Sequence, residues 1–151
     1  MTKASTKRKA ALVFEDGTRF EGVFAGTSGE AQGEVVIKTD LVGYQEIITD
    51  PANAGKIVVM TMPQIGNYGV NVEDIHPDAT SPEPVIAGLI VREMCYEPSS
   101  FRATDSLPRY LDTAGIPALD EVDIRAITLY LRTKNLEEPG QTAKIVQGEG
   151  E

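Results

Sequence analysis

Cysteine and histidine, the side chains best suited to nucleophilic catalysis, occur once each in this chain, as Cys95 and His76. Cys95 lies close to Glu93 and Glu97, and neighbouring carboxylates raise the pKa of a thiol, the opposite of what a nucleophile requires. It also lacks the small flanking residues that expose a nucleophile on a tight turn. We therefore expect a structural cysteine and a solvated histidine. One cysteine and one histidine cannot make a Cys/His zinc site within the chain.

Carboxylates in two places could hold a hard cation or act as an acid and a base. Glu46 and Asp50 stand one helical turn apart, and Asp120, Glu121 and Asp123 cluster before an expected helix. Carboxylates in turns and before helices more often accept hydrogen bonds from backbone N–H groups. We therefore expect both groups to tie down loops and cap helices, and we expect no metal or cofactor.

An Asp-Gly pair near the N-terminus predicts a β-hairpin. Asp16-Gly17 stands between two apolar-rich runs, 11–15 and 18–24, and a type I′ turn needs two residues that tolerate positive φ. Residues 25–33 are expected to form a loop rich in Gly, Ser and Thr. Residues 34–39 then predict a strand.

The middle of the chain predicts a short helix and two buried strands. Residues 44–49 are expected to be helical, with Pro51 ending the helix. Two continuous apolar runs, 56–62 and 85–91, predict adjacent strands buried on both faces. The acidic, proline-containing stretch 72–84 is expected to be a surface loop.

The last third predicts two helices and a short strand. A helix over 105–114 is expected to end at Gly115, which favours the left-handed C′ position. Residues 116–119 predict a short strand, and Asp123 is expected to cap a helix over 124–134. The buried stripe of that helix is expected to consist of Ile124, Ile127 and Leu131.

Composition and charge narrow the classes of function. The chain has 151 residues and a net charge of −9, with 14 basic against 23 acidic residues. Such an acidic body repels nucleic acid and anionic membranes, and no apolar run is long enough to span a bilayer. We expect a basic flexible tail over 1–10, one domain over 11–136 and a flexible tail over 137–151. Strands that precede helices favour an α+β fold.

Two motifs identify a family. Residues 43–51, GYQEIITDP, and residues 63–71, PQIGNYGVN, resemble the N-terminal domain of the small (glutamine amidotransferase) subunit of carbamoyl phosphate synthetase. The resemblance covers about residues 11–136. It is supported in chain order by matches at 14–18, 33–36, 87–93, 98–103 and 122–128.

The resemblance implies a three-layer β/β/α domain without catalytic residues of its own. In the family, a C-terminal class I amidotransferase domain with a Cys/His/Glu triad hydrolyses glutamine. Ammonia then passes to a large synthetase subunit, in the cytoplasm, for pyrimidine and arginine biosynthesis. The N-terminal domain contacts both the amidotransferase domain and the large subunit and lines part of the ammonia path. The amidotransferase domain has no counterpart within these residues.

The resemblance also assigns site residues. Ala52 stands at the glutamine-contact position, where the family has Ser, and Glu121 and Ile124 stand where Gly and Thr are common. Asp40 and Leu41 replace the small residue and Met of the tunnel lining. We expect the first motif and residues 66–71 to lie side by side at one end of the central strand. The tunnel and interface positions are Asp40, Leu41, Gly43, Tyr44, Gln45, Glu46, Thr49, Asp50, Gly66, Asn67 and Gly69.

Two alternatives to a docking domain remain open. One is a standalone interaction or regulatory protein derived from the same domain. The other is a small enzyme that uses Cys95 or the Glu46/Asp50 pair.

Overall fold

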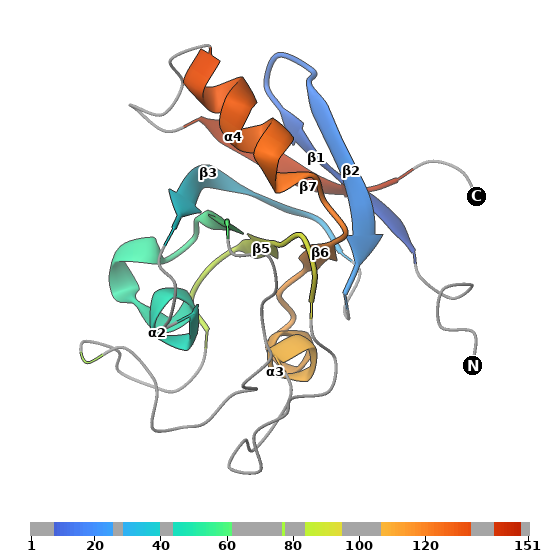
Figure 1. The fold of residues 1–151 in the computed structure, drawn as a ribbon. Helices are drawn as coiled ribbons and strands as arrows, with labels where there is room; N and C mark the ends of the chain where they lie inside the picture. The colour runs from blue at the N-terminus through green and yellow to red at the C-terminus, as the bar shows by residue number, and fades with distance from the viewer. Residues whose placement is uncertain are drawn as a thin grey trace.

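The computed structural model describes residues 8–25, 29–39, 44–61, 77, 84–94, 107–133 and 141–148. The strands of these residues form one closed sheet in the order β1-β2-β6-β5-β4-β3-β7 (Figure 1). The strands are β1 (Lys9–Phe14), β2 (Arg19–Phe24), β3 (Ala31–Lys38), β4 (Ile57–Met60), β5 (Gly88–Ile90), β6 (Ala118–Asp120) and β7 (Thr142–Gln147). The helices are α2 (Tyr44–Thr49), the 3-10 helix η1 (Pro51–Asn53), α3 (Leu107–Thr113) and α4 (Ile124–Thr133).

The predicted hairpin is confirmed, but its turn is of another type. β1 and β2 pair antiparallel, with Val13 opposite Arg19. The N–H of Phe14 donates to Thr18 O and that of Gly17 to Phe14 O, which leaves a three-residue loop. Gly17 has a φ of +90°, whereas Asp16 is not among the residues with positive φ. A type I′ turn needs two such residues, so the loop matches a tight turn followed by a glycine bulge.

The strands β3, β4, β5 and β6 are parallel to one another. Parallel neighbours need crossover connections, and α2 with η1 and α3 lie in two of them. Strands and helices therefore alternate here, which differs from the expected order of strands first and helices later. The α+β class holds, with a sheet-dominated fold and few helices, and the three-layer β/β/α arrangement stays a prediction.

The two apolar runs form adjacent buried strands, as predicted, but both strands are shorter. Ile57 pairs with Gly88 and Val59 with Ile90 across the β4–β5 ladder. Before β5, Ala87 N donates to Lys56 O, so the chain contacts β4 without extending the strand. Every residue of β4 and β5 is buried. On the other side of β4, β3 begins at Ala31, within the stretch expected to be a loop.

The expectation of a flexible tail over 137–151 is wrong for Thr142–Gln147, which form β7. This strand pairs antiparallel with both β1 and β3, so it closes the sheet. Ala143 and Ile145 are buried at 1% and 0% exposure because alternate residues of the strand face the interior. The tail over 1–10 is also shorter than expected, since Lys9 and Ala10 belong to β1.

Two hydrophobic clusters lie on opposite faces of β4. Val58 and Met60 belong to the cluster covered by α2 and α3, whereas Ile57 and Val59 belong to the cluster under α4. Figure 1 shows α4 on one side of the sheet and α2 and α3 on the other. The predicted stripe of α4 is confirmed as buried, and it consists of Ile124, Ile127 and Leu131.

Helix α3 ends at Thr113, one residue before its predicted end, and Gly115 occupies the predicted C′ position. Its φ is +74°, its N–H donates to Asp112 O, and the N–H of Ile116 donates to Leu111 O. This is the Schellman pattern, and Leu111 and Ile116 share a hydrophobic cluster, as the pattern favours. The expected beginning of this helix and the loop expected over 72–84 lie almost wholly outside the described residues. None of the described helices is long and apolar enough to span a membrane.

An aromatic cluster joins α4 to the hairpin. Tyr130 packs against Phe14 and Phe20, at ring-centroid distances of 4.9 and 5.6 Å, and its hydroxyl donates to Asp16 Oδ2 at 2.8 Å. Burial, and then the hydrogen bond to Asp16, raise the pKa of Tyr130 above 10.0. Neutral tyrosine is therefore favoured in the folded state.

We expect Tyr130→Phe to lower stability below pH 10 and to flatten the alkaline part of the stability profile. Because the folded pKa is raised, the contribution of the hydroxyl is fully present below the unfolded pKa, near 10.0, and is lost as pH rises through the folded pKa. Urea unfolding of both proteins between pH 7 and 11 should show the difference shrinking above pH 10. Parallel profiles across that range would contradict this assignment.

Candidate functional site

The segment from α2 to η1 carries most of the predicted site residues that the structure describes. Helix α2 has the bounds predicted for it, Tyr44–Thr49, and Asp50 caps the helix that follows. Asp50 Oδ1 accepts from Ala52 N at 2.9 Å, and Asp50 O accepts from Asn53 N at 2.9 Å. Pro51, which was expected to end the first helix, is also the first residue of η1. The prediction that Asp50 ties down a loop is confirmed.

Two buried polar side chains hold this segment in place. Thr49 is fully buried, and its Oγ1 donates to Glu46 O at 3.3 Å. Asn53 is 4% exposed, and its Nδ2 donates to Ile47 O at 2.9 Å. Ile47 O also accepts from Asp50 N at 3.3 Å, so the side chain of Asn53 adds a second hydrogen bond to this carbonyl at the end of α2. Sequence reasoning missed Asn53, because an asparagine in a turn carries no signal of burial.

Backbone hydrogen bonds connect α2 and the turn after η1 to Val85, three residues before β5. Val85 N donates to Ile48 O at 2.9 Å, and Gly55 N donates to Val85 O at 3.0 Å. Gly55 has a φ of +73°, which only glycine adopts readily. The α2–η1 segment is thus fixed from both sides, at the amino ends of β4 and β5.

The arrangement argues against acid–base chemistry at Glu46 and Asp50. Glu46 is exposed, whereas Asp50 is partly buried and accepts a backbone hydrogen bond. Ala52, at the position where the resemblance places Ser, is exposed and has no hydroxyl or other reactive group. The segment can therefore present a fixed backbone surface but no visible nucleophile. Among the described residues, no group of three or more His, Cys, Asp or Glu side chains could hold a metal ion.

Several predicted positions lie outside the described residues. Tyr44 and Gln45 are placed only as backbone of α2. The predicted contact between the first motif and residues 66–71 stays a prediction. The remaining undescribed positions are Asp40, Leu41, Gly43, Gly66, Asn67, Gly69, His76 and Cys95.

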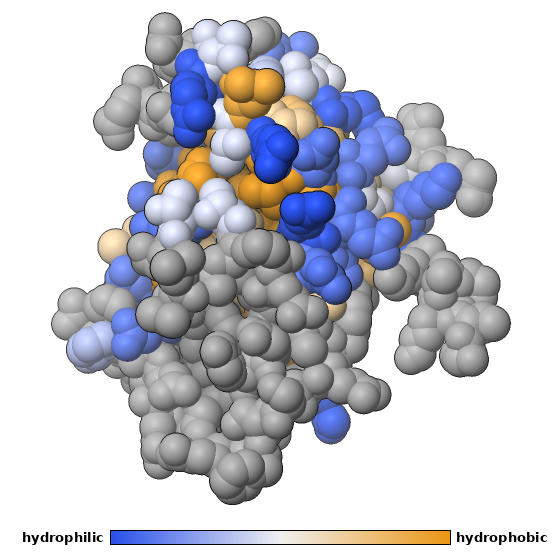
Figure 2. Space-filling view, in the orientation of Figure 1, coloured by the Kyte–Doolittle hydropathy of each residue, from blue (hydrophilic) through white to orange (hydrophobic). Residues whose placement is uncertain are grey.

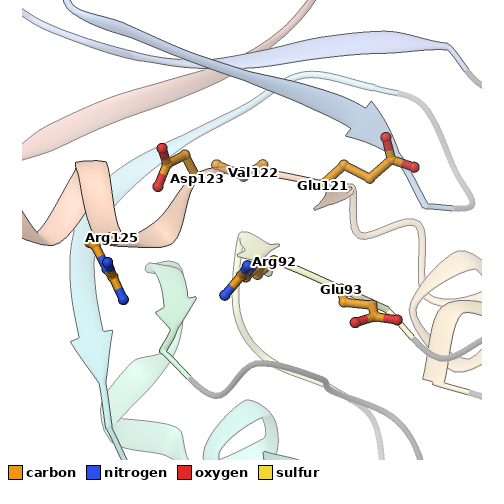
Figure 3. A pocket seen from close by; sticks show the side chains of 6 residues that line it. All are labelled: Arg92, Glu93, Glu121, Val122, Asp123 and Arg125. Atoms are coloured by element: carbon orange, nitrogen blue, oxygen red, sulfur yellow. The ribbon is translucent and has the colours of Figure 1, made fainter.

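A solvent-open pocket of about 710 Å³ lies at the carboxyl ends of β5 and β6 (Figure 3). Beneath it, Asp120 is 3% exposed, and its Oδ1 accepts from Met94 N at 2.9 Å and Glu121 N at 2.8 Å. Asp123 caps α4 by accepting from Ala126 N at 3.0 Å, as predicted. Asp120 and Asp123 thus accept hydrogen bonds from backbone N–H groups. The pocket is lined by Arg92, Glu93, Glu121, Val122, Asp123 and Arg125.

Glu121 is the described non-glycine residue with positive φ, at 63°. It stands where the resemblance places Gly, and a side chain in this left-handed region costs roughly 1–2 kcal/mol. We expect Glu121→Gly to raise stability by about 1 kcal/mol, or roughly 2–4 °C in melting temperature. Glu93→Gly, at an exposed neighbouring position that is not among those with positive φ, should not stabilise. A lower melting temperature for Glu121→Gly would contradict the strain.

Comparisons with a family model and with individual proteins both find carbamoyl phosphate synthase small chains. The family described as "Carbamoyl-phosphate synthase small chain, CPSase domain" matches residues 12–139. A carbamoyl phosphate synthase small chain from Solidesulfovibrio magneticus is 48% identical over 124 residues, which are 82% of this chain and 32% of that protein. Its counterpart from Caldanaerobacter subterraneus is 49% identical over 124 residues, 82% of this chain and 34% of that protein. The one from Thermotoga maritima is 46% identical over 127 residues, 84% of this chain and 31% of that protein.

The chain spans about a third of the length of these relatives. Among solved structures, an aminopeptidase from Aneurinibacillus sp. strain AM-1 aligns with a TM-score of 0.48 at 13% identity. It covers 94% of this chain and 30% of that one, and the similarity is too low to say more.

Proposed function

Because this chain belongs to the carbamoyl-phosphate synthase small-chain family, through that family's CPSase domain, we propose that it is a docking domain. It serves a glutamine-dependent carbamoyl phosphate synthetase and contacts the large subunit. It also packs on the amidotransferase part of the small subunit and lines part of the ammonia path. The family match over residues 12–139 is the observation that carries this proposal.

The geometry of the α2–η1 segment supports a structural role. Its polar side chains are used internally, as Asp50, Thr49 and Asn53 each make a hydrogen bond within the segment. A surface fixed in this way loses little conformational entropy on binding, which favours docking. The same family membership supports the three-layer β/β/α arrangement, a cytoplasmic location, and a role in pyrimidine and arginine biosynthesis.

A competition experiment tests the docking role. Excess chain, added to the separated subunits of a family synthetase during reassembly, should occupy the large subunit in place of the intact small subunit. Glutamine-dependent carbamoyl phosphate synthesis should then fall, while synthesis from added ammonia should remain. Unchanged glutamine-dependent synthesis at saturating chain would argue against docking, and an equal fall of both rates would indicate a regulatory protein instead.

We expect no glutamine hydrolysis by the chain itself. The described residues offer no nucleophile at the α2–η1 segment, and the sequence around Cys95 is unsuited to one. Ammonia release from glutamine should match the buffer rate, with or without thiol alkylation. Turnover that Cys95→Ala abolishes would support the small-enzyme alternative, and turnover that Asp50→Asn abolishes would assign it to the Glu46/Asp50 pair.

A further inference from the structure

Two arginine side chains in the pocket at the carboxyl ends of β5 and β6 have no partner among the described residues. Arg92 is separated from the end of β5 by Val91, and Arg125 lies in the first turn of α4; both arginines are exposed. Neither guanidinium takes part in an ion pair or hydrogen bond within the described part of the chain. Figure 3 shows both guanidinium groups on the same side of the pocket.

The carboxylates around the pocket do not neutralise these arginines. Asp123 caps α4, and Glu93 and Glu121 each have interactions of their own. In Figure 3 the carboxylates of Glu121 and Asp123 point to the side opposite the guanidinium groups. The two guanidinium forks therefore keep their capacity to bind a carboxylate through paired hydrogen bonds. This is unexpected in a chain with 23 acidic against 14 basic residues.

We propose that this pocket receives an acidic side chain of the large subunit, whose carboxylate bridges Arg92 and Arg125. The inference rests on the docking role proposed above and names one of its contacts. A protein segment fits the lining better than a free polyanion does, because the pocket holds three carboxylates beside two guanidinium groups. A polyanion would be repelled by those carboxylates, whereas a protein can place a cation against them.

The surroundings of the pocket also suit a protein interface. Val122 lies in the lining between the charged side chains, but at 1% exposure it belongs to the interior and contributes almost no surface to the pocket. Figure 2 shows apolar surface beneath α4, bordered by hydrophilic side chains. Apolar surface bordered by polar and charged side chains is the usual composition of an interface between proteins.

The position of the pocket favours the large subunit over the amidotransferase domain. The α2–η1 segment, which holds the glutamine-contact position Ala52 by resemblance, precedes β4 and lies at the amino ends of β4 and β5. Arg92 and Arg125 follow β5 and β6 and lie at the carboxyl ends. Opposite edges of the same strands can contact different partners at the same time.

Titration with a family large subunit tests the assignment. We expect the double variant Arg92→Ala/Arg125→Ala to raise the Kd at least about tenfold and to weaken the dependence of Kd on salt. The double variant Arg92→Lys/Arg125→Lys keeps the charge but loses the paired hydrogen bonds. Its Kd should therefore lie between that of the unmodified chain and that of the double Ala variant. Arg132→Ala removes the same charge from an exposed position on the same helix and should leave Kd unchanged. Melting temperatures of all variants verify that they are folded.

The outcomes separate the two proposals. Binding by the unmodified chain that the double Ala variant retains in full would overturn the pocket assignment and leave the docking role intact. No binding by the unmodified chain would overturn both. Inorganic phosphate can be titrated into the chain while the NMR signal of the Val122 amide is followed. If phosphate bound saturably and the double Ala variant kept its affinity for the large subunit, the pocket would be assigned to a small anion instead.

Discussion

A chain that stops at Gly140, before β7, is expected not to fold. Removing β7 deletes Ala143 and Ile145 from the interior and breaks two antiparallel ladders, one with β1 and one with β3. Loss of a buried isoleucine side chain alone costs roughly 2–5 kcal/mol, against a total stability of about 5–15 kcal/mol for a domain. The exposed edges of β1 and β3 should also promote aggregation. Circular dichroism and size-exclusion chromatography report both effects.

The control is a chain that ends at Gly148, which keeps β7 and loses only residues 149–151. Its melting temperature should match that of the full chain. Ile145→Ala provides an intermediate case, with an expected loss of roughly 2–5 kcal/mol. A cooperative thermal transition at the original temperature in the chain that stops at Gly140 would show that β7 is dispensable.

Val59→Asp is expected to destabilise the fold by more than about 4 kcal/mol. Val59 is fully buried in the centre of the closed sheet, where it pairs with Ile37 on β3 and Ile90 on β5. An aspartate there would be surrounded by the apolar side chains of the cluster, so it must either lose its charge or disrupt the packing. The melting temperature should fall by more than roughly 8 °C, or folding should be lost.

Gln147→Asp is a matched control for Val59→Asp. It adds the same negative charge on a strand, but at an exposed residue of β7. We expect a change in stability within about 1 kcal/mol. If the two variants unfolded at the same denaturant concentration, the central position of β4 would be refuted.

Local patterns in the sequence predicted the elements whose stability is local. Helix α2 agrees with its predicted bounds because Pro51 marks its end, and α3 ends within one residue of its predicted end because Gly115 supplies the left-handed residue. Helix α4 agrees because Asp123 caps it and its apolar stripe repeats at helical spacing. Each of these signals lies within a few residues of the structure that it specifies.

Distant partners explain what could not be predicted. Thr142–Gln147 is a strand because β1 and β3 pair with it from either side, and those ladders join residues more than a hundred positions apart. The sequence around it resembles a tail, because 137–151 contains one proline, three glycines and several glutamates and few apolar residues. A distant residue also explains why position 88 is a glycine. Ile145 on β7 occupies the space that a side chain at this position would need.

The site shows the same division. The pattern around residues 44–51 located the α2–η1 segment, and Asp50 was expected to tie a loop. Burial of Asn53 and Asp120 could not be predicted, because each stabilises backbone groups brought together only by the fold. Arg92 and Arg125 likewise line one pocket only because β5 and β6, which precede them, are neighbouring strands.

Sedimentation velocity of this chain mixed with a family large subunit tests the docking role most directly. At 16.3 kDa the free chain sediments slowly, so a complex is resolved from it without ambiguity. The docking role predicts that the chain co-sediments with the large subunit in equimolar amount and that intact small subunit displaces it. If all of the chain stayed at the position of the free protein at micromolar concentrations of both, the docking role would be contradicted.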